Sequence, residues 1–192
     1  MMQRHTKLAM VLALAALSPF ALRAQAAAGT EYSFKLGLVN PQGDLRSLTH
    51  NSLGWGGEFD YDWLPTKETG VGVGLNAGYL VARGKRSATL NYDSKAAYAG
   101  VDLIYAITDT PLSIRSGLQL ISWDITAMQD PTGSGAQGET SWKLGARFGL
   151  EYRINKAWSV STMYDFSHWK SDTVNNMGYN PSFVTLMAGY KF

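Results

Sequence analysis

The chain has 192 residues, of which 17% are charged and 45% are hydrophobic, and it contains no Cys. This length suits one domain of ordinary size, and the apolar content excludes a disordered chain because there is ample surface to bury. The lack of Cys excludes disulfide scaffolds, thiolate metal sites and thiol nucleophiles.

The first residues carry the pattern of a secretory signal peptide. Arg4 and Lys7 precede an unbroken apolar run over residues 8–17, and the small residues Ala24 and Ala26 follow at the expected cleavage positions. A helical membrane anchor would need about 20 apolar residues, and Pro19 interrupts the run too early for that. We therefore expect residues 1–26 to be removed during export.

Cleavage after Ala26 would leave a mature domain of residues 27–192. Residues 1–26 hold three basic residues and no acidic one, so the remainder has 14 basic and 15 acidic residues. The net charge of +2 for the whole chain therefore comes from the signal peptide. A basic, nucleic-acid-binding protein is not supported, and we expect no nucleic acid among the partners.

Apolar and polar residues alternate along the mature chain, which is the period of a β-strand with one apolar face. From Leu53 to Trp63, the odd positions are bulky and apolar except Gly57, and the even positions are Gly, Glu or Asp. The alternation recurs in eight segments, at residues 32–38, 53–63, 71–81, 97–107, 112–120, 142–154, 158–166 and 184–192. A strand crosses a membrane at a tilt with about 9–11 residues, so these segments are candidate membrane strands.

The connections between these segments alternate in length. Tight turns are expected near residues 65–69, 108–111 and 155–157, and longer polar connections near 40–52, 84–95, 124–140 and 170–181. Short turns at one end and long loops at the other are typical of outer-membrane barrels. The sequence therefore predicts an all-β fold, an eight-stranded antiparallel up-and-down transmembrane β-barrel with both termini at the short-turn end.

The volume of the side chains indicates which face looks inward. The apolar face carries 16 of the 22 aromatic residues of the mature chain. An eight-stranded barrel has an interior just wide enough for side chains to fill, so this face must look outward. The opposite face holds eleven glycines, which leave room for charged side chains in the lumen.

The C-terminus ends in Gly-Tyr-Lys-Phe, with Tyr190 and Phe192 on the outward register. This ending resembles the C-terminal signature that the barrel-assembly machinery reads. With the signal peptide and eight strands, the mature chain resembles the small outer-membrane barrels of the OmpX/Ail type and the OmpA transmembrane domain.

This resemblance implies Sec export through the periplasm to the outer membrane of a Gram-negative-type bacterium. The implied partners are outer-membrane lipids with lipopolysaccharide, the assembly machinery, and host or environmental surface ligands. No cofactor is implied. This family hosts many functions on one fold, so the function has to be argued from sites.

Twelve charged residues fall on the inward face. The six acids are Glu58, Asp60, Asp62, Asp102, Glu151 and Asp165, and the six bases are Lys35, Arg115, Lys143, Arg147, Arg153 and Lys191. Equal numbers favour a buried ion-pair network that fills the lumen, because an unpaired buried charge is costly. A proton relay or a selectivity ring is the alternative, but a conducting filter would more often carry one sign in excess.

Two enzyme families share this barrel shape and are alternatives to a non-catalytic barrel. A PagL-like lipid A deacylase uses a His and a Ser two residues apart. Here the residue two positions after His168 is Lys170, and Ser171, three positions after it, would not share its face. A PagP-like palmitoyltransferase has a His in the first outer loop and Asp-Ser in the second, to which His50, Asp93 and Ser94 would correspond.

The first hypothesis is a closed, non-enzymatic barrel whose outer loops serve envelope integrity, adhesion or defence. The second is one of the lipid A-modifying enzymes, and the third is a narrow channel or a port for small apolar molecules. No metal-ligand cluster or phosphate-binding glycine loop stands out in the sequence.

Overall fold

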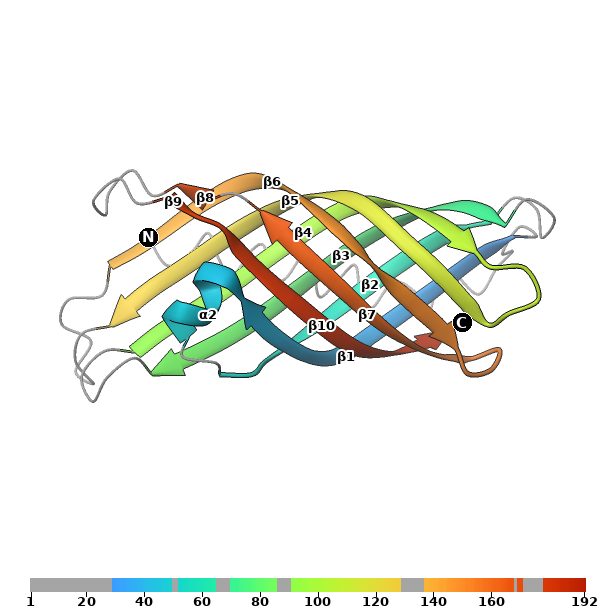
Figure 1. Ribbon diagram of the computed structural model, residues 1–192, viewed down its shortest axis with the longest axis horizontal. Helices are drawn as coiled ribbons and strands as arrows, with labels where there is room; N and C mark the ends of the chain where they lie inside the picture. Colours follow the sequence, from blue (N-terminus) through green and yellow to red (C-terminus); the bar gives the residue numbers. More distant parts are fainter. Residues whose placement is uncertain are drawn as a thin grey trace.

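The computed structural model describes residues 29–49, 52–64, 70–85, 91–128, 137–167, 169–170 and 178–192. Eight strands form a closed barrel in the order β1-β10-β7-β6-β5-β4-β3-β2, and β1 pairs with β10 to close it (Figure 1). Their bounds are Thr30–Gln42 (β1), Gly54–Trp63 (β2), Val71–Lys85 (β3), Asn91–Ala106 (β4), Leu112–Met128 (β5), Gln137–Arg153 (β6), Trp158–Ser167 (β7) and Pro181–Lys191 (β10). A separate two-stranded sheet joins β8 (Trp169–Lys170) to β9 (Gly178–Tyr179).

All neighbouring strands of the barrel are antiparallel. The predicted eight-stranded up-and-down barrel is thus confirmed. Among the described residues, no helix is long and apolar enough to span a membrane.

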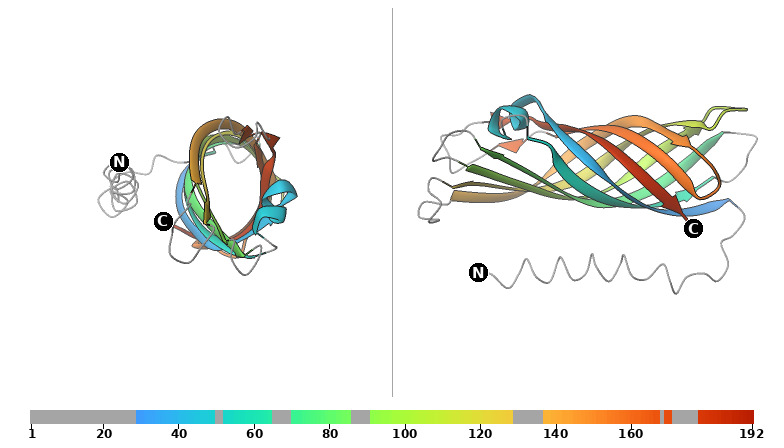
Figure 2. Two further views of the ribbon diagram at one scale, coloured as in Figure 1. Left: turned by 90° about the vertical axis from the view of Figure 1, so that its left-hand side faces the viewer. Right: turned by 90° about the horizontal axis from the view of Figure 1, so that it is seen from below.

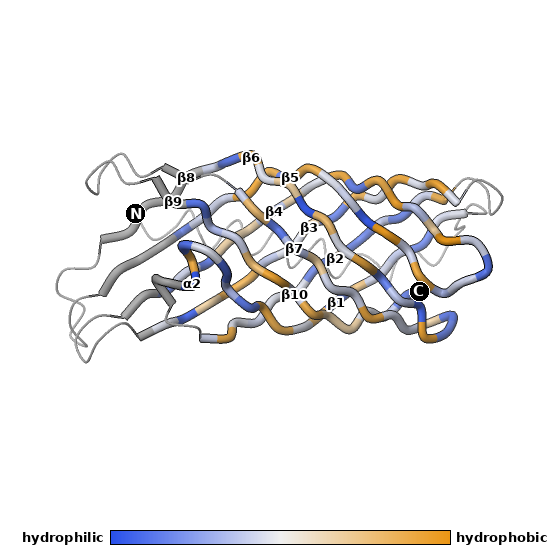
Figure 3. The backbone as a smooth tube through the Cα atoms, in the orientation of Figure 1, coloured by the Kyte–Doolittle hydropathy of each residue, from blue (hydrophilic) through white to orange (hydrophobic). Residues whose placement is uncertain are grey.

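The two faces of the strands point as the alternation predicts. Leu36, Leu75, Leu118 and Leu144 are more than half exposed on the outside, whereas polar residues between them are buried inside. Figure 3 shows the same alternation along the backbone. Because successive side chains of a strand point to opposite sides, the apolar side chains form a continuous outer surface around the barrel.

The two ends of the barrel differ. At the short-turn end, the described chain begins at Gly29 and ends at Phe192, whose backbone N–H donates to the carbonyl of Tyr32 at 3.0 Å. The turn after β6 is held by Asn155, whose Oδ1 accepts the backbone N–H groups of Ala157 and Trp158. We call the opposite end the outer end.

At the outer end, several strands are longer than the alternation predicts. Residues 84–85, 91–95, 124–128 and 137–140, expected in polar connections, belong to β3, β4, β5 and β6. Their ladders continue, for example from Gly84 to Tyr92 and from Asp93 to Thr126. The sequence pattern misses them because these residues are largely polar on both faces, so no period-two signal marks the strand.

The expected loop at residues 40–52 contains a short helix, α2 (Gly43–Thr49). Gly43 starts it with φ at +53°, a conformation that glycine adopts at low cost. The side chain of Leu45 is fully buried, and α2 contacts β1 and β10 on one side and β3 and β4 on the other. Figure 2 shows α2 at the rim of the barrel, at the outer end. This helix therefore covers part of the outer opening.

Candidate functional site in the barrel lumen

The centre of the lumen holds ten charged side chains that come from seven strands. They are Lys35, Glu58, Asp60, Asp62, Asp102, Arg115, Arg147, Glu151, Asp165 and Lys191, none of them more than 9% exposed. We call these ten residues the lumen network. Their positions follow from the strand period, which sends every second residue inward.

Arg115 on β5 lies at the middle of this network. Its Nη1 donates to Glu151 Oε2 at 2.7 Å, and its Nη2 donates to Asp62 Oδ1. Its Nη2 also lies 3.8 Å from Asp60 Oδ1, and its Nε lies 3.4 Å from Asp102 Oδ2. One guanidinium therefore joins carboxylates from β2, β4 and β6.

Lys35 and Arg147 extend the network toward β1 and β7. The ammonium group of Lys35 lies 2.7 Å from Asp60 Oδ2 and 3.1 Å from Glu151 Oε2. Arg147 donates from Nη1 to Glu58 Oε2 at 2.8 Å and from Nη2 to Glu58 Oε1 at 3.3 Å. A bidentate pair of this kind is among the stronger charge-assisted interactions in proteins.

Two further contacts show how tightly the network is packed. Asp102 bridges the two arginines, since its Oδ1 lies 3.8 Å from Nε of Arg147. A Cβ atom at Gly74 would lie 2.6 Å from Asp62 Oδ1 and 2.7 Å from Arg115 Nη2. Glycine at position 74 therefore leaves the space into which these two charged side chains reach.

Two of the twelve predicted lumen charges lie apart from the network. Lys143 is partly exposed, and no ion pair joins it to another described residue. Arg153 lies at the short-turn end, where its side chain is 42% exposed and its Nη2 lies 2.6 Å from Glu31 Oε2. The buried network thus contains six acids and four bases rather than six of each.

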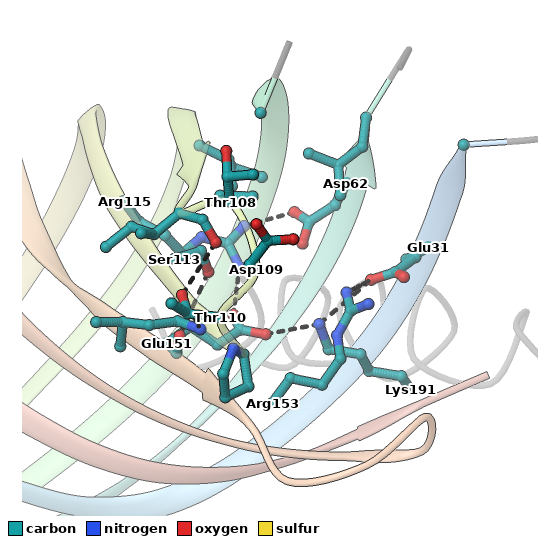
Figure 4. A pocket seen from close by; sticks show the side chains of 18 of the residues that line it. Glu31, Asp62, Thr108, Asp109, Thr110, Ser113, Arg115, Glu151, Arg153 and Lys191 are labelled. Atoms are coloured by element: carbon teal, nitrogen blue, oxygen red, sulfur yellow. Dashed lines mark hydrogen bonds and ion pairs between the residues drawn. The ribbon is translucent and has the colours of Figure 1, made fainter. Parts of the chain in front are cut away.

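The network opens at the short-turn end into a cavity of about 510 Å³, which we call the vestibule (Figure 4). A chain of ion pairs crosses it. Glu151 binds Arg115 on one side and Lys191 on the other at 2.7 Å each, and Lys191 lies 3.2 Å from Glu31, which binds Arg153. Sequence reasoning missed Glu31 because the first strand was read from Tyr32, although residue 31 shares the inward register of Lys35.

The outer half of the interior is apolar. Its buried cluster, which we call the apolar cluster, comprises Val39, Leu45, Leu80, Ala96, Tyr98, Ile121, Trp123 and Phe183. The Trp123 indole packs edge-to-face on Phe183 with ring centroids 6.0 Å apart, and its N–H donates to Ser167 Oγ at 2.9 Å. The sequence does contain a sign of this cluster. Apolar residues occur on both faces of the same strand in Tyr79-Leu80-Val81 and in Leu120-Ile121.

Tyr98 joins the two halves of the interior. Its ring belongs to the apolar cluster, and its hydroxyl donates to Glu58 Oε2 at 2.9 Å. A Cβ atom at Gly78 on the neighbouring strand would collide with this ring. Glycine at position 78 therefore leaves the space that the ring occupies.

The residues proposed for lipid A chemistry are placed only in part. His50 and His168 lie outside the described residues. Asp93 and Ser94 were expected in an outer loop, but they lie on β4. Ser94 is buried, whereas Asp93 pairs with Arg83 at 3.3 Å and with Lys95 at 3.1 Å. Because neighbouring residues of a strand point to opposite faces, the side chains of Asp93 and Ser94 point away from each other.

The terminal aromatic residues lie on the outside, at the seam where β1 meets β10. Tyr190 and Phe192 are each about half exposed. The Phe192 ring stacks on Tyr32 with centroids 6.3 Å apart, and Tyr190 packs edge-to-face on Trp158 at 5.2 Å.

Within the part of the chain that the structure describes, no group of three or more His, Cys, Asp or Glu side chains could hold a metal ion.

The family model described as "Outer membrane protein beta-barrel domain" matches residues 8–192. No curated protein sequence matches the chain.

Several solved structures share the fold. Ail, the attachment invasion locus protein of Yersinia pestis, solved in complex with the heparin analogue sucrose octasulfate, is 16% identical with a TM-score of 0.59, covering 85% of this chain and 99% of Ail. Neisserial surface protein A is 18% identical with a TM-score of 0.53, covering 87% and 98%. OprG from Pseudomonas aeruginosa is 11% identical with a TM-score of 0.57, covering 85% and 96%.

Proposed function

The chain belongs to the family of outer-membrane β-barrel proteins, and we propose that it is a closed, non-catalytic barrel that presents its outer connections at the cell surface. Its localisation is the outer membrane. The observation that carries the proposal is the lumen network, in which Arg115, Arg147 and Lys35 tie together carboxylates from four strands. Pulling one charge out of such a network costs several kcal/mol per ion, so the network favours a shut lumen.

Planar bilayer recording tests the closed state. The wild-type protein is expected to give no stable, porin-sized conductance. The Glu58→Ala, Asp60→Ala double variant should leak, because it removes the principal carboxylate partners of Arg147 and Lys35. Glu31→Ala is the matched control, since Glu31 lies in the vestibule and its loss should leave the lumen shut. Large, reproducible steps from wild type would refute the closed barrel.

The proposed role at the surface is adhesion to host or environmental ligands, with envelope integrity or defence as related tasks. The likeness to Ail, whose solved complex holds a heparin analogue, supports an adhesive barrel. Cells that express the protein should bind to immobilised heparin more than cells carrying an empty vector, and soluble heparin should compete. Equal binding by the two strains would argue against a sulfated glycan as ligand.

Mass spectrometry of lipid A separates this proposal from lipid A modification. Lipid A from cells with and without the protein should have the same acyl chains. Loss or gain of one acyl chain on expression would replace the non-catalytic proposal with the deacylase or the acyltransferase.

Assembly is proposed to depend on the terminal residues Tyr190 and Phe192, which lie exposed on the outer surface of the last strand. Deleting Phe192 should leave the protein in the periplasm with little folded barrel, because the assembly machinery would no longer engage this end. Heat-modifiable mobility on gels measures the folded fraction. Wild-type amounts of folded barrel in the outer membrane would exclude this role for Phe192.

A further inference from the structure

The wall of the barrel has a step where β7 ends. β6 pairs with β5 along residues 137–152, but it pairs with β7 only from Gly145 to Arg153. On the other side, the pairing of β10 with β7 reaches no further than Ser182 opposite Phe166. Among the described strands, the first eight residues of β6 are thus paired on one side only, above the end of β7 (Figure 1).

A groove of about 640 Å³ lies at this step. Six of its lining residues belong to the outward register, namely Leu118, Leu144, Ala146, Tyr164, Phe166 and Ser182, which lies opposite Phe166. Two others, Gly145 and Ser167, belong to the inward register. In an unbroken strand wall these two sets lie on opposite faces, so a groove that touches both enters the thickness of the wall.

The groove is apolar on one side and polar on the other. Leu118 and Leu144 are 60% and 68% exposed on the outer surface of the barrel. Toward α2 the lining changes to Asp44, Asn180 and Ser182, and Asp44 Oδ2 accepts the backbone N–H of Asn180 at 2.7 Å. The polar side therefore lies toward the outer end of the barrel, and the apolar side lies toward its middle.

The inner wall of the groove rests on the apolar cluster. Ser167 accepts the hydrogen bond of the Trp123 indole, and a Cβ atom at Gly145 would lie 2.7 Å from Ile121 Cδ1. Because the side chains beneath the groove are closely packed and buried, its shape is held by the barrel interior. A preformed recess binds a ligand at a lower cost in ordering than a mobile surface does.

We propose that this groove binds one acyl chain of an outer-leaflet lipid, whose head group lies against the polar side near α2. The groove opens on the lipid-facing surface, where acyl chains are the surrounding medium. Its order from polar to apolar matches a lipid of the outer leaflet, whose head points outward and whose chain points to the membrane centre. Asp44 and the Ser182 hydroxyl accept hydrogen bonds, so a head group with N–H or O–H donors fits.

Photo-crosslinking of the full-length barrel tests this site. The protein is folded into phosphatidylcholine vesicles that contain phosphatidylethanolamine with a diazirine on one acyl chain, and the labelled peptides are identified by mass spectrometry. We expect about tenfold more label around Leu144 to Ala146 and Tyr164 to Phe166 than around the outward residues Ala99 and Val101, which corresponds to about 1.4 kcal/mol. Even labelling around the barrel would show annular lipid only and would overturn the proposal, as would absence of label from the groove.

A matched pair of variants sharpens the test. Ala146→Trp places an indole in the groove from the lipid side, whereas Ala99→Trp makes the same change on the outward face of β4, away from the groove. Groove labelling should fall toward the level of the rest of the surface in the first variant and remain unchanged in the second. Unchanged labelling in folded Ala146→Trp would refute the site. If that variant does not fold, the labelling pattern of the wild-type protein decides the question.

Discussion

The two halves of the barrel interior are filled by different chemistry. Toward the short turns, ten charged side chains pair with one another, whereas under α2 eight mainly apolar side chains pack as they do in a soluble protein core. The charged half depends on every partner being present, since a buried charge without its partner is expensive. The apolar half depends on volume, since a missing group leaves a cavity. The two halves of the interior are therefore stabilised by different interactions, and substitutions in one half or the other can separate the two contributions.

The largest effect is expected from Arg115→Met in the charged half. This variant keeps much of the side-chain volume but removes the cation that joins Asp62, Asp102 and Glu151. Breaking a buried network by removing one partner costs about 3–5 kcal/mol. Urea unfolding of the barrel in lipid bilayers measures the loss. A loss of unfolding free energy smaller than that expected for an exposed ion pair would mean that water or ions replace the guanidinium.

Leu80→Ala tests the apolar half. Leu80 is fully buried in the apolar cluster, and a Leu→Ala change in a packed core costs about 2–5 kcal/mol, depending on how far the cavity collapses. Leu120→Ala is the control, because Leu120 is half exposed on the outer surface. Both are measured by the same unfolding titration. A larger loss for Leu120→Ala would show that contact with lipid matters more than the apolar cluster.

Tyr98→Phe tests the junction between the two halves. The variant keeps the ring in the apolar cluster and removes the hydroxyl that donates to Glu58. Glu58 retains its bidentate pair with Arg147, so we expect a loss of about 1.5–3 kcal/mol, typical of a hydrogen bond to a charged group. No measurable loss would mean that the two halves are independent at this point.

The smallest effect is expected from Arg153→Met at the mouth of the vestibule. Its pair with Glu31 is partly exposed on both sides, with side chains 42% and 33% accessible. Pairs of this kind contribute about 0–1 kcal/mol, so the unfolding midpoint should move little and less still at high salt. A loss as large as that of Arg115→Met would show that the ion-pair chain of the vestibule acts as one unit with the lumen network.

The strands and the direction of their faces could be predicted from the sequence, and so could the inward position of Arg115, Arg147 and their acids. Strand period is local, because each residue alternates in direction with the next. The same argument fails at the ends of strands. Glu31 was missed one residue before an expected strand, and Asp93 and Ser94 were assigned to a loop that β4 occupies.

The pairing itself was decided by the tertiary structure. Arg115 and Asp62 are 53 residues apart and meet only because barrel closure places β5 across the lumen from β2. Closure also decided that Arg153 faces solvent at the rim while Arg147, on the same face of the same strand, is buried. The position of a residue along the barrel axis determines how deeply its side chain is buried. The two-residue alternation of a strand contains no information about that position.

By itself the sequence determined an exported, eight-stranded pattern with an apolar outer face and a charged inner face, since these depend on neighbouring residues along one chain segment. Only the tertiary structure decided that α2 lies at the outer rim above the apolar cluster, and that the pairing of β6 continues past the end of β7. These features depend on which strands become neighbours and how far each extends past the next. That is settled by register and closure, which act between segments distant in the sequence.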